Sequence, residues 1–87
     1  MRIIYSPQFS REYQQLPEII KRKAEEKEKV FCANPFDTRL KTHKLEGRLS
    51  ELWFFYIDYR YRIIFELRDE KAAIFHAVGD HSVYKKL

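Results

Sequence analysis

Residues 48–67 read RLSELWFFYIDYRYRIIFEL, and this stretch decides the fold. It contains the only Trp of the chain and three of the seven Phe, together with two consecutive Ile residues. Aromatic and β-branched side chains fit the pleated, half-buried surface of a β-sheet better than the surface of a helix. We therefore predict that most of this stretch forms β-strands.

The same stretch predicts a β-hairpin with strands at residues 52–57 and 61–67. The turn falls at residues 58–60, where Asp58 can accept hydrogen bonds from nearby backbone N–H groups. Side chains of a strand alternate between its two faces. This alternation predicts a helix-facing, mainly structural set: Trp53, Phe55, Ile57, Tyr61, Ile63 and Phe65. Arg62 then lies on the opposite face, where an ion pair with Glu66 is the alternative to a functional role.

Two helices are predicted before the hairpin, after a short first strand at residues 2–5. Ser6-Pro7 is a helix start, because Ser caps free N–H groups and Pro fits the first turn. The apolar residues that follow at helical spacing are Phe9, Tyr13 and Leu16. The second helix is expected from Pro17 to Cys32, and its outer surface carries both basic and acidic side chains. Mixed charge favours a solvent-exposed face over a patch that binds nucleic acid.

The rest of the chain predicts a loop at residues 36–46 and a last strand at residues 72–78. Gly79-Asp80 then turns the chain into residues 81–84. The order strand, helix, helix, strand, strand, strand predicts a single α+β domain over residues 1–87. Its two N-terminal helices pack on one face of a small antiparallel sheet, and the other face is free or covered by a partner.

Composition narrows the class of protein. The formal net charge of +4 is mildly basic, which permits a polyanionic partner without requiring one. No apolar run approaches the roughly 20 residues that span a bilayer, and the polar start does not resemble a signal peptide. With a single Cys, which cannot form an internal disulfide, we expect a cytoplasmic protein and no membrane partner. Two glycines exclude a glycine-rich phosphate loop, and the scattered His residues lack metal-site spacing, so we expect no metal and no cofactor.

Five dispersed side chains carry the candidate chemistry: His43, Lys44, Arg62, His81 and Tyr84. The first two precede the first hairpin strand, Arg62 lies in the second, and the last two follow the final strand. These side chains converge on one surface if the segments meet at one end of the sheet. Such a set suits metal-free cleavage of RNA. A base removes the ribose 2′-OH proton, a cation stabilises the phosphate charge, and an acid protonates the leaving 5′ oxygen. Histidine suits proton transfer near neutral pH, and arginine binds phosphate through two parallel hydrogen bonds. Taken singly, each residue is more often an ordinary loop or core residue.

Four stretches, which together cover almost the whole chain, resemble the RelE/ParE superfamily of toxins from bacterial toxin–antitoxin systems. They are residues 4–9 (IYSPQF), residues 16–20 (LPEII), residues 43–65 with Gly47, Trp53 and YRIIF at its end, and residues 78–84 (VGDHSVY). The resemblance is greatest to the YafQ-like members, which are ribosome-dependent mRNA endonucleases. It implies a toxin that inhibits translation by cutting mRNA through 2′-OH attack. The implied partners are the ribosome, mRNA and a cognate antitoxin.

The resemblance also assigns roles to residues. Arg62 matches the family's phosphate-contacting arginine, and His43 matches the catalytic histidine that YafQ-like members carry just before the hairpin. His81 falls where the family has a basic residue after the last strand, and Tyr84 resembles the aromatic residue near the C-terminus. We therefore expect these four residues to be catalytic. The cations expected to contact RNA are Lys44, Arg48 and Arg60.

The hairpin departs from the family at several positions. RelE-like members carry lysines on the first hairpin strand, where this chain has residues 53–56 (WFFY). YafQ-like members carry a second histidine where this chain has Tyr56, and an Asp-Trp pair where it has Arg60-Tyr61. The departures leave the general base open and keep a second function open: a ParE-like inhibitor of DNA gyrase, which acts by binding and has no nuclease site. A third alternative is a small α+β domain whose histidines are incidental. Two histidines around an arginine favour the endonuclease.

Overall fold

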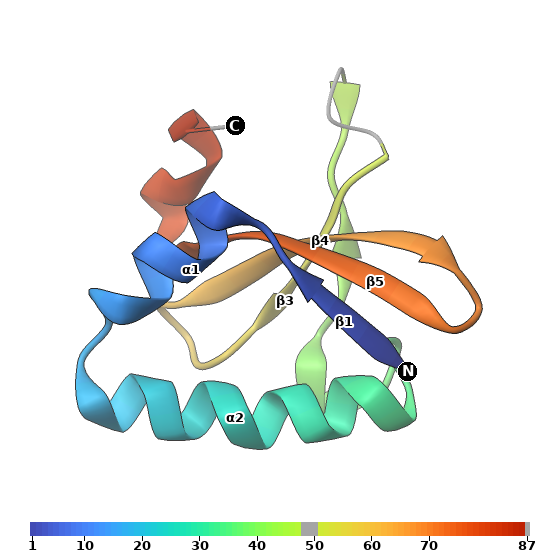
Figure 1. Ribbon diagram of the computed structural model, residues 1–87, viewed down its shortest axis with the longest axis horizontal. Helices are drawn as coiled ribbons and strands as arrows, with labels where there is room; N and C mark the ends of the chain where they lie inside the picture. The colour runs from blue at the N-terminus through green and yellow to red at the C-terminus, as the bar shows by residue number, and fades with distance from the viewer. Residues whose placement is uncertain (48–50, 87) are drawn as a thin grey trace.

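One five-stranded sheet organises the chain, with its strands in the order β1-β5-β4-β3-β2 (Figure 1). The computed structural model describes residues 1–47 and 51–86. In chain order the elements are β1 (Arg2–Tyr5), α1 (Pro7–Gln14), α2 (Glu18–Ala33), η1 (Thr38–Leu40), β2 (His43–Lys44), β3 (Trp53–Tyr56), β4 (Arg62–Asp69), β5 (Ala72–Gly79) and η3 (His81–Lys86). No helix among the described residues is long and apolar enough to cross a membrane. The predicted α+β class with two N-terminal helices is confirmed.

The strand pairings are antiparallel apart from β1, which runs parallel to β5. The predicted hairpin is β3–β4, and it pairs Trp53 with Phe65 and Tyr56 with Arg62. One prediction is wrong: residues 36–46, predicted as a loop, contain the short helix η1 and the strand β2. The two residues of β2 pair with β3 because the outer edge of β3 offers free backbone groups.

Helix α1 is fastened to β5 by side chains at its start and its middle. The Ser6 hydroxyl accepts a hydrogen bond from the Phe9 N–H (3.0 Å), as expected of a helix cap, and donates one to the His76 carbonyl (2.9 Å). The Glu12 carboxylate accepts a hydrogen bond from the Val78 N–H (3.1 Å). The predicted cap of α1 therefore also fixes the helix against the sheet.

Both helices cover one face of the sheet, and α2 runs along it (Figure 1). The ring of Phe31 in α2 lies 5.1 Å from that of Phe55, 4.8 Å from that of Phe65 and 5.2 Å from that of Phe75. The predicted helix-facing set is confirmed. Its members buried in this core are Phe55, Ile57, Ile63 and Phe65, and those packed against it are Trp53 and Tyr61.

The opposite face of the sheet is partly covered by the chain's own C-terminal helix, η3. Ile64, Ala77 and Val83 are buried together there, and Phe54 and Tyr84 are among the side chains packed against them. The pairing of β4 with β5 joins Ile64 to Ala77 but Phe65 to Phe75, so His76 is an extra residue in β5. Such a β-bulge re-aims the side chains that follow it, and here it turns Ala77 toward η3. The face predicted to be free or partner-covered is thus closed by η3 in this region.

Candidate functional site around Arg62

The tight turn between β3 and β4 positions Arg62. Asp58 Oδ1 accepts hydrogen bonds from the backbone N–H groups of Arg60 (2.8 Å) and Tyr61 (2.7 Å), which is the turn chemistry that the sequence predicts. Arg62 is the first residue of β4 and pairs with Tyr56 on one side and Gly79 on the other. Its side chain lies on the face away from the two helices.

The Arg62 guanidinium lies among three aromatic rings. Its central carbon is 4.8 Å from the ring centroid of Tyr56, 5.6 Å from that of Phe54 and 5.7 Å from that of Tyr84. Its Nη1 atom donates a hydrogen bond to the Tyr84 hydroxyl (3.1 Å). The face of an aromatic ring attracts a cation, so rings from β3 and η3 together hold the guanidinium in one orientation.

No described carboxylate forms an ion pair with Arg62. Glu66, the alternative partner weighed from the sequence, instead contacts His76 Nε2 (2.9 Å) and Arg68 Nε (3.6 Å). The buried Nε atom of Arg62 also has no hydrogen-bond partner among the described residues. A guanidinium whose charge is not neutralised by its surroundings is suited to bind an anion.

His43 lies on the same face as Arg62 through the pairing of β2 with β3. Its ring stacks on Phe54 with centroids 5.4 Å apart and meets Tyr56 edge-on at 6.5 Å. The same two rings contact Arg62, so they connect the imidazole to the guanidinium. Since His43 is exposed, its ring can exchange a proton with a bound molecule.

The helix η3 brings Tyr84 to Arg62. The three rings of Phe54, Tyr56 and Tyr84 around Arg62 form the ring cluster, and His81 lies outside it. The Asp80 carboxylate accepts hydrogen bonds from the Ser82 N–H (2.9 Å) and hydroxyl (2.6 Å), and these bonds lower the pKa of Asp80. They fix the start of η3, from which Tyr84 packs edge-on against Phe54 at 5.9 Å. His81 is the exposed first residue of η3. It interacts electrostatically with the neighbouring Asp80 carboxylate.

The cations predicted to contact RNA do not gather around Arg62. Lys44 pairs with Trp53, and its Nζ lies 5.7 Å from the Trp53 ring, which packs against the helix-facing core. Arg60 lies 5.5 Å from the ring of Tyr61, which packs against the same core. Arg48 falls outside the described residues. The structure therefore brings together His43, Arg62 and Tyr84, but places Lys44 and Arg60 elsewhere.

Two members of the ring cluster, Phe54 and Tyr56, were not among the predicted site residues. The signal for them is present in the sequence: they alternate with Phe55, so they share the face of Arg62. Their aromatic character suggests core residues, and only the pairing of β3 with β4 and the position of η3 show that they enclose a cation.

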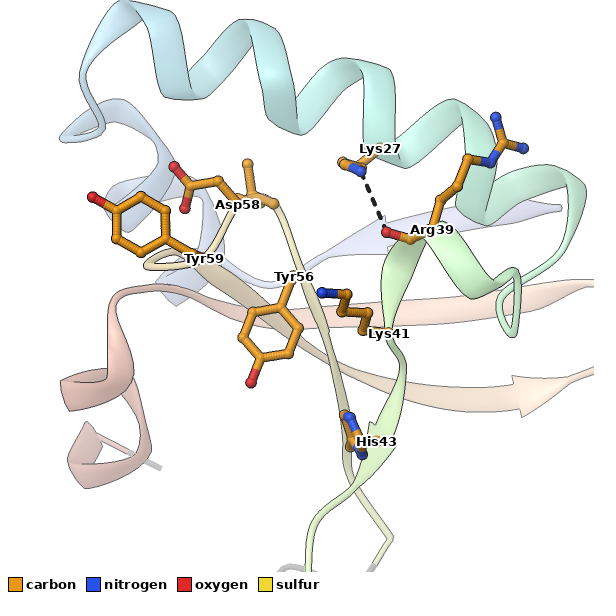
Figure 2. Close-up of a pocket in the computed structure, with 8 residues that line it drawn as sticks. Lys27, Arg39, Lys41, His43, Tyr56, Asp58 and Tyr59 are labelled. Atoms are coloured by element: carbon orange, nitrogen blue, oxygen red, sulfur yellow. Dashed lines mark hydrogen bonds between the residues drawn. The ribbon is translucent and has the colours of Figure 1, made fainter.

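An open pocket of about 460 Å³ adjoins this cluster (Figure 2). His43 and Tyr56 form one wall, Lys27 and Lys41 approach from α2 and from the segment after η1, and the turn at residues 58–59 completes it. Sequence patterns gave no sign of this pocket, because Lys27 belongs to a mixed-charge helix surface and Lys41 to a predicted loop.

Solved structures of toxins have a fold similar to that of this chain. YafQ from E. coli strain BL21(DE3) is 21% identical over 97% of this chain and 98% of its own, with a TM-score of 0.79. A YoeB/ParE toxin from Agrobacterium tumefaciens is 15% identical over 93% of this chain and 99% of its own, also with a TM-score of 0.79. The E. coli DinJ–YafQ toxin–antitoxin complex matches with 21% identity over 92% of this chain and 91% of the other, and a TM-score of 0.75. No protein-family model and no curated protein sequence matches the chain.

The chain has the fold of the RelE/ParE toxins. On this RelE/ParE fold, the described residues bring no group of three or more His, Cys, Asp or Glu side chains close enough to hold a metal ion. The site they do form combines one guanidinium, one imidazole and the phenols of Tyr56 and Tyr84. Such a site can bind an anion through the guanidinium and transfer protons to or from that anion through the imidazole and the phenols.

Proposed function

We propose that this chain is the toxin of a type II toxin–antitoxin system and cleaves mRNA on the ribosome. The observation that carries the proposal is the Arg62 guanidinium, which lies among three rings with no described counter-ion and donates a hydrogen bond to Tyr84. His43 contacts two of the same rings. An RNA phosphodiester is an anion flanked by groups that must lose and gain protons during cleavage. The RelE/ParE fold supports the proposal by analogy.

In the proposed reaction Arg62 binds a non-bridging oxygen of the scissile phosphate. A base removes the proton of the adjacent ribose 2′-OH, and the 2′ oxygen forms a bond to phosphorus. The bond from phosphorus to the 5′ oxygen then breaks, and an acid protonates that oxygen. The products are a 2′,3′-cyclic phosphate and a free 5′-OH. Negative charge grows on the phosphate in the transition state, where a fixed guanidinium stabilises it most.

The proton-transfer roles are assigned to groups on the Arg62 face. We assign one to His43, which is exposed and shares two rings with Arg62. The second is assigned to η3, which offers His81 at its start and the Tyr84 hydroxyl beside Arg62. Because Tyr84 accepts the hydrogen bond from Arg62, its own O–H proton remains free to be donated.

The proposed partners follow from this activity. The substrate is mRNA in the ribosome, which implies a cytoplasmic protein. We also propose a cognate antitoxin, since YafQ of similar fold occurs in a toxin–antitoxin complex with DinJ.

In vitro translation with primer extension on the message tests the proposal. The wild type should give discrete cuts that require ribosomes, and Arg62→Ala should give none. Arg68→Ala is the matched control, because Arg68 is an exposed arginine of the same strand and lies outside the ring cluster. Arrest of DNA gyrase by the wild type without any cut in the message would overturn the proposal in favour of the ParE-like alternative.

A further inference from the structure

The pocket beside His43 is built from three separate parts of the chain. Lys27 comes from α2, Lys41 from the segment between η1 and β2, and Tyr56 and Tyr59 from β3 and the turn after it. Figure 2 shows the two lysines approaching from one side and the two tyrosine rings on the other. Its volume of about 460 Å³ lies within the range typical of small-ligand sites.

The positive charge inside this pocket comes from Lys27 and Lys41. Lys27 Nζ donates one hydrogen bond to the Arg39 carbonyl (3.3 Å), and Lys41 forms no ion pair with a described residue. The Arg39 guanidinium points away from the pocket (Figure 2). It pairs with Asp37 at 3.0 Å. The charge of Arg39 is therefore directed outside the pocket. Lys27 also interacts electrostatically with Asp37, which leaves Lys41 as the lysine of the pocket that has no ionic interaction with a described residue.

The acidic group at the rim, Asp58, forms no ion pair with either lysine among the described residues. Its Oδ1 atom accepts the N–H groups of Arg60 and Tyr61 that hold the turn. Lys41 also has a positive φ of 52°, a conformation in which glycine is the least strained residue. A long cationic side chain stands there instead, and its ammonium reaches toward Tyr56 (Figure 2).

The pocket is bordered by an aromatic ring that is almost fully exposed to solvent. Tyr59 is 90% exposed, although tyrosine usually covers apolar surface. An exposed ring beside lysines is the combination with which proteins bind single-stranded nucleic acid, since bases stack on the ring and phosphates contact the cations. Tyr56 belongs to the ring cluster and also lines the pocket. His43 lines the pocket and stacks on Phe54 of the ring cluster, so the pocket and the Arg62 site adjoin each other.

We propose that this pocket binds a nucleotide of single-stranded RNA that neighbours the scissile phosphate, and the inference rests on the proposed function. Lys27 and Lys41 hold the phosphate of that nucleotide, and the Tyr59 ring stacks on its base. The pocket then fixes which phosphate of the strand reaches Arg62, and so contributes to the choice of the cleavage position.

Binding of a short fluorescent 2′-O-methyl RNA oligonucleotide, which lacks the attacking hydroxyl, tests the inference. Lys27→Gln and Lys41→Gln should each weaken binding about three- to fivefold at low salt. Each should also lower the slope of log affinity against log salt concentration by about 0.7. Lys71→Gln is the matched control, because Lys71 is an exposed lysine in the β4–β5 turn, and it should bind like the wild type.

A second pair of variants tests the base-stacking ring. Tyr59→Ala should weaken binding of the same oligonucleotide about tenfold, and Tyr59→Phe should retain binding because the ring is kept. Both should fold, since Tyr59 is 90% exposed.

Message cleavage by the wild type separates this inference from the function on which it rests. If the wild type cleaves message while the Lys27, Lys41 and Tyr59 variants bind RNA as the wild type does, the pocket assignment is wrong and the endonuclease stands. If the wild type neither cleaves message nor binds the oligonucleotide, both are wrong. Weaker binding by the pocket variants, with Lys71→Gln unchanged and message cleaved by the wild type, supports the pocket. The same binding result without any cleavage would overturn the placement of the pocket beside a scissile phosphate and leave only RNA binding.

Discussion

The Arg62 guanidinium and the Tyr84 hydroxyl are 22 residues apart in the chain and 3.1 Å apart in the structure. The contact joins the start of β4 to the C-terminal helix η3, across the end of the sheet where β4 pairs with β5. It orients the guanidinium through a hydrogen bond to a hydroxyl, and no described carboxylate pairs with Arg62. The packing of η3 therefore covers this part of the sheet and also orients the Arg62 guanidinium.

Arg62→Ala should abolish toxicity and leave the fold intact. The guanidinium makes no ion pair among the described residues, so its removal loses the ring contacts and the hydrogen bond to Tyr84, at a cost of about 1–3 kcal/mol that the fold should survive. A charge-assisted contact to phosphate contributes about 1.5–3 kcal/mol, which corresponds to at least a tenfold loss in rate. Growth inhibition measured together with a thermal melt checks the loss of toxicity and the intact fold.

Arg62→Lys should recover little toxicity, because an ammonium lacks the planar pair of donors. A folded Arg62→Ala variant that stops growth at full strength would remove Arg62 from the site.

Tyr84→Phe separates orientation from proton donation. The variant keeps the ring contacts to Phe54 and Arg62 and loses only the hydroxyl. If Tyr84 is the acid, the cleavage rate should fall about 10²–10⁴-fold. If it only orients Arg62, the loss of one hydrogen bond should cost no more than about tenfold. Single-turnover cleavage on programmed ribosomes, with Tyr84→Ala for comparison, distinguishes the two outcomes.

Phe65→Ala should destabilise the protein by about 3–5 kcal/mol, because it leaves a cavity against Phe31 and Phe55. That loss is a large part of the stability of a small domain. Phe36→Ala is the comparison, since Phe36 is 50% exposed and should change the unfolding free energy far less. Equal melting temperatures for Phe65→Ala and the wild type would contradict the observed core.

The sequence predicts the parts of the fold that depend on repeated local patterns. Alternation along β3 and β4 identifies the helix-facing side correctly, because a strand with one buried face has a well-specified register. The cap at Ser6 and the turn at Asp58 are also predicted, since each needs only one side chain and its neighbouring N–H groups. The face of Arg62 follows from the same alternation.

The parts that sequence patterns do not predict depend on contacts between distant segments. The bulge at His76 has no local signature, yet it turns Ala77 toward Val83 and so lets η3 cover the sheet. The strand β2 is only two residues long, and its register with β3 places His43 beside Phe54 and Lys44 on the other face. The rings that enclose Arg62 and the lysines of the pocket meet only through this tertiary arrangement.

Asp80→Ala should loosen η3 and withdraw Tyr84 from Arg62. The hydrogen bonds from Ser82 hold the pKa of Asp80 below its ordinary value. A carboxyl whose folded pKa is lowered contributes stability above its unfolded pKa, and loses it as the pH falls through the folded pKa. The melting-temperature difference between wild type and Asp80→Ala should therefore be present at neutral pH and vanish in strong acid. A difference that stays constant with pH would show that the Asp80 charge is not what fixes η3.

The last prediction concerns the histidines and separates an enzyme from a binding protein. If His43 transfers a proton during cleavage, His43→Ala should slow the chemical step about 10²–10⁴-fold and alter its dependence on pH. Binding to the ribosome should change far less, because the imidazole need not be charged to hold the complex. The measurement is single-turnover cleavage on programmed ribosomes over a range of pH.

His81→Ala completes this test because His81 lies outside the ring cluster. If His81 is the second proton-transfer group, its replacement should lower the rate as strongly as that of His43. If Tyr84 has that role, His81→Ala should cleave nearly as fast as the wild type while Tyr84→Phe is slow. Equal rates for wild type, His43→Ala and His81→Ala would mean that neither imidazole moves a proton, and catalysis would then rest on the charge of Arg62 and the Tyr84 hydroxyl. A gyrase inhibitor predicts no cleavage at any pH, and histidine changes that act only through affinity.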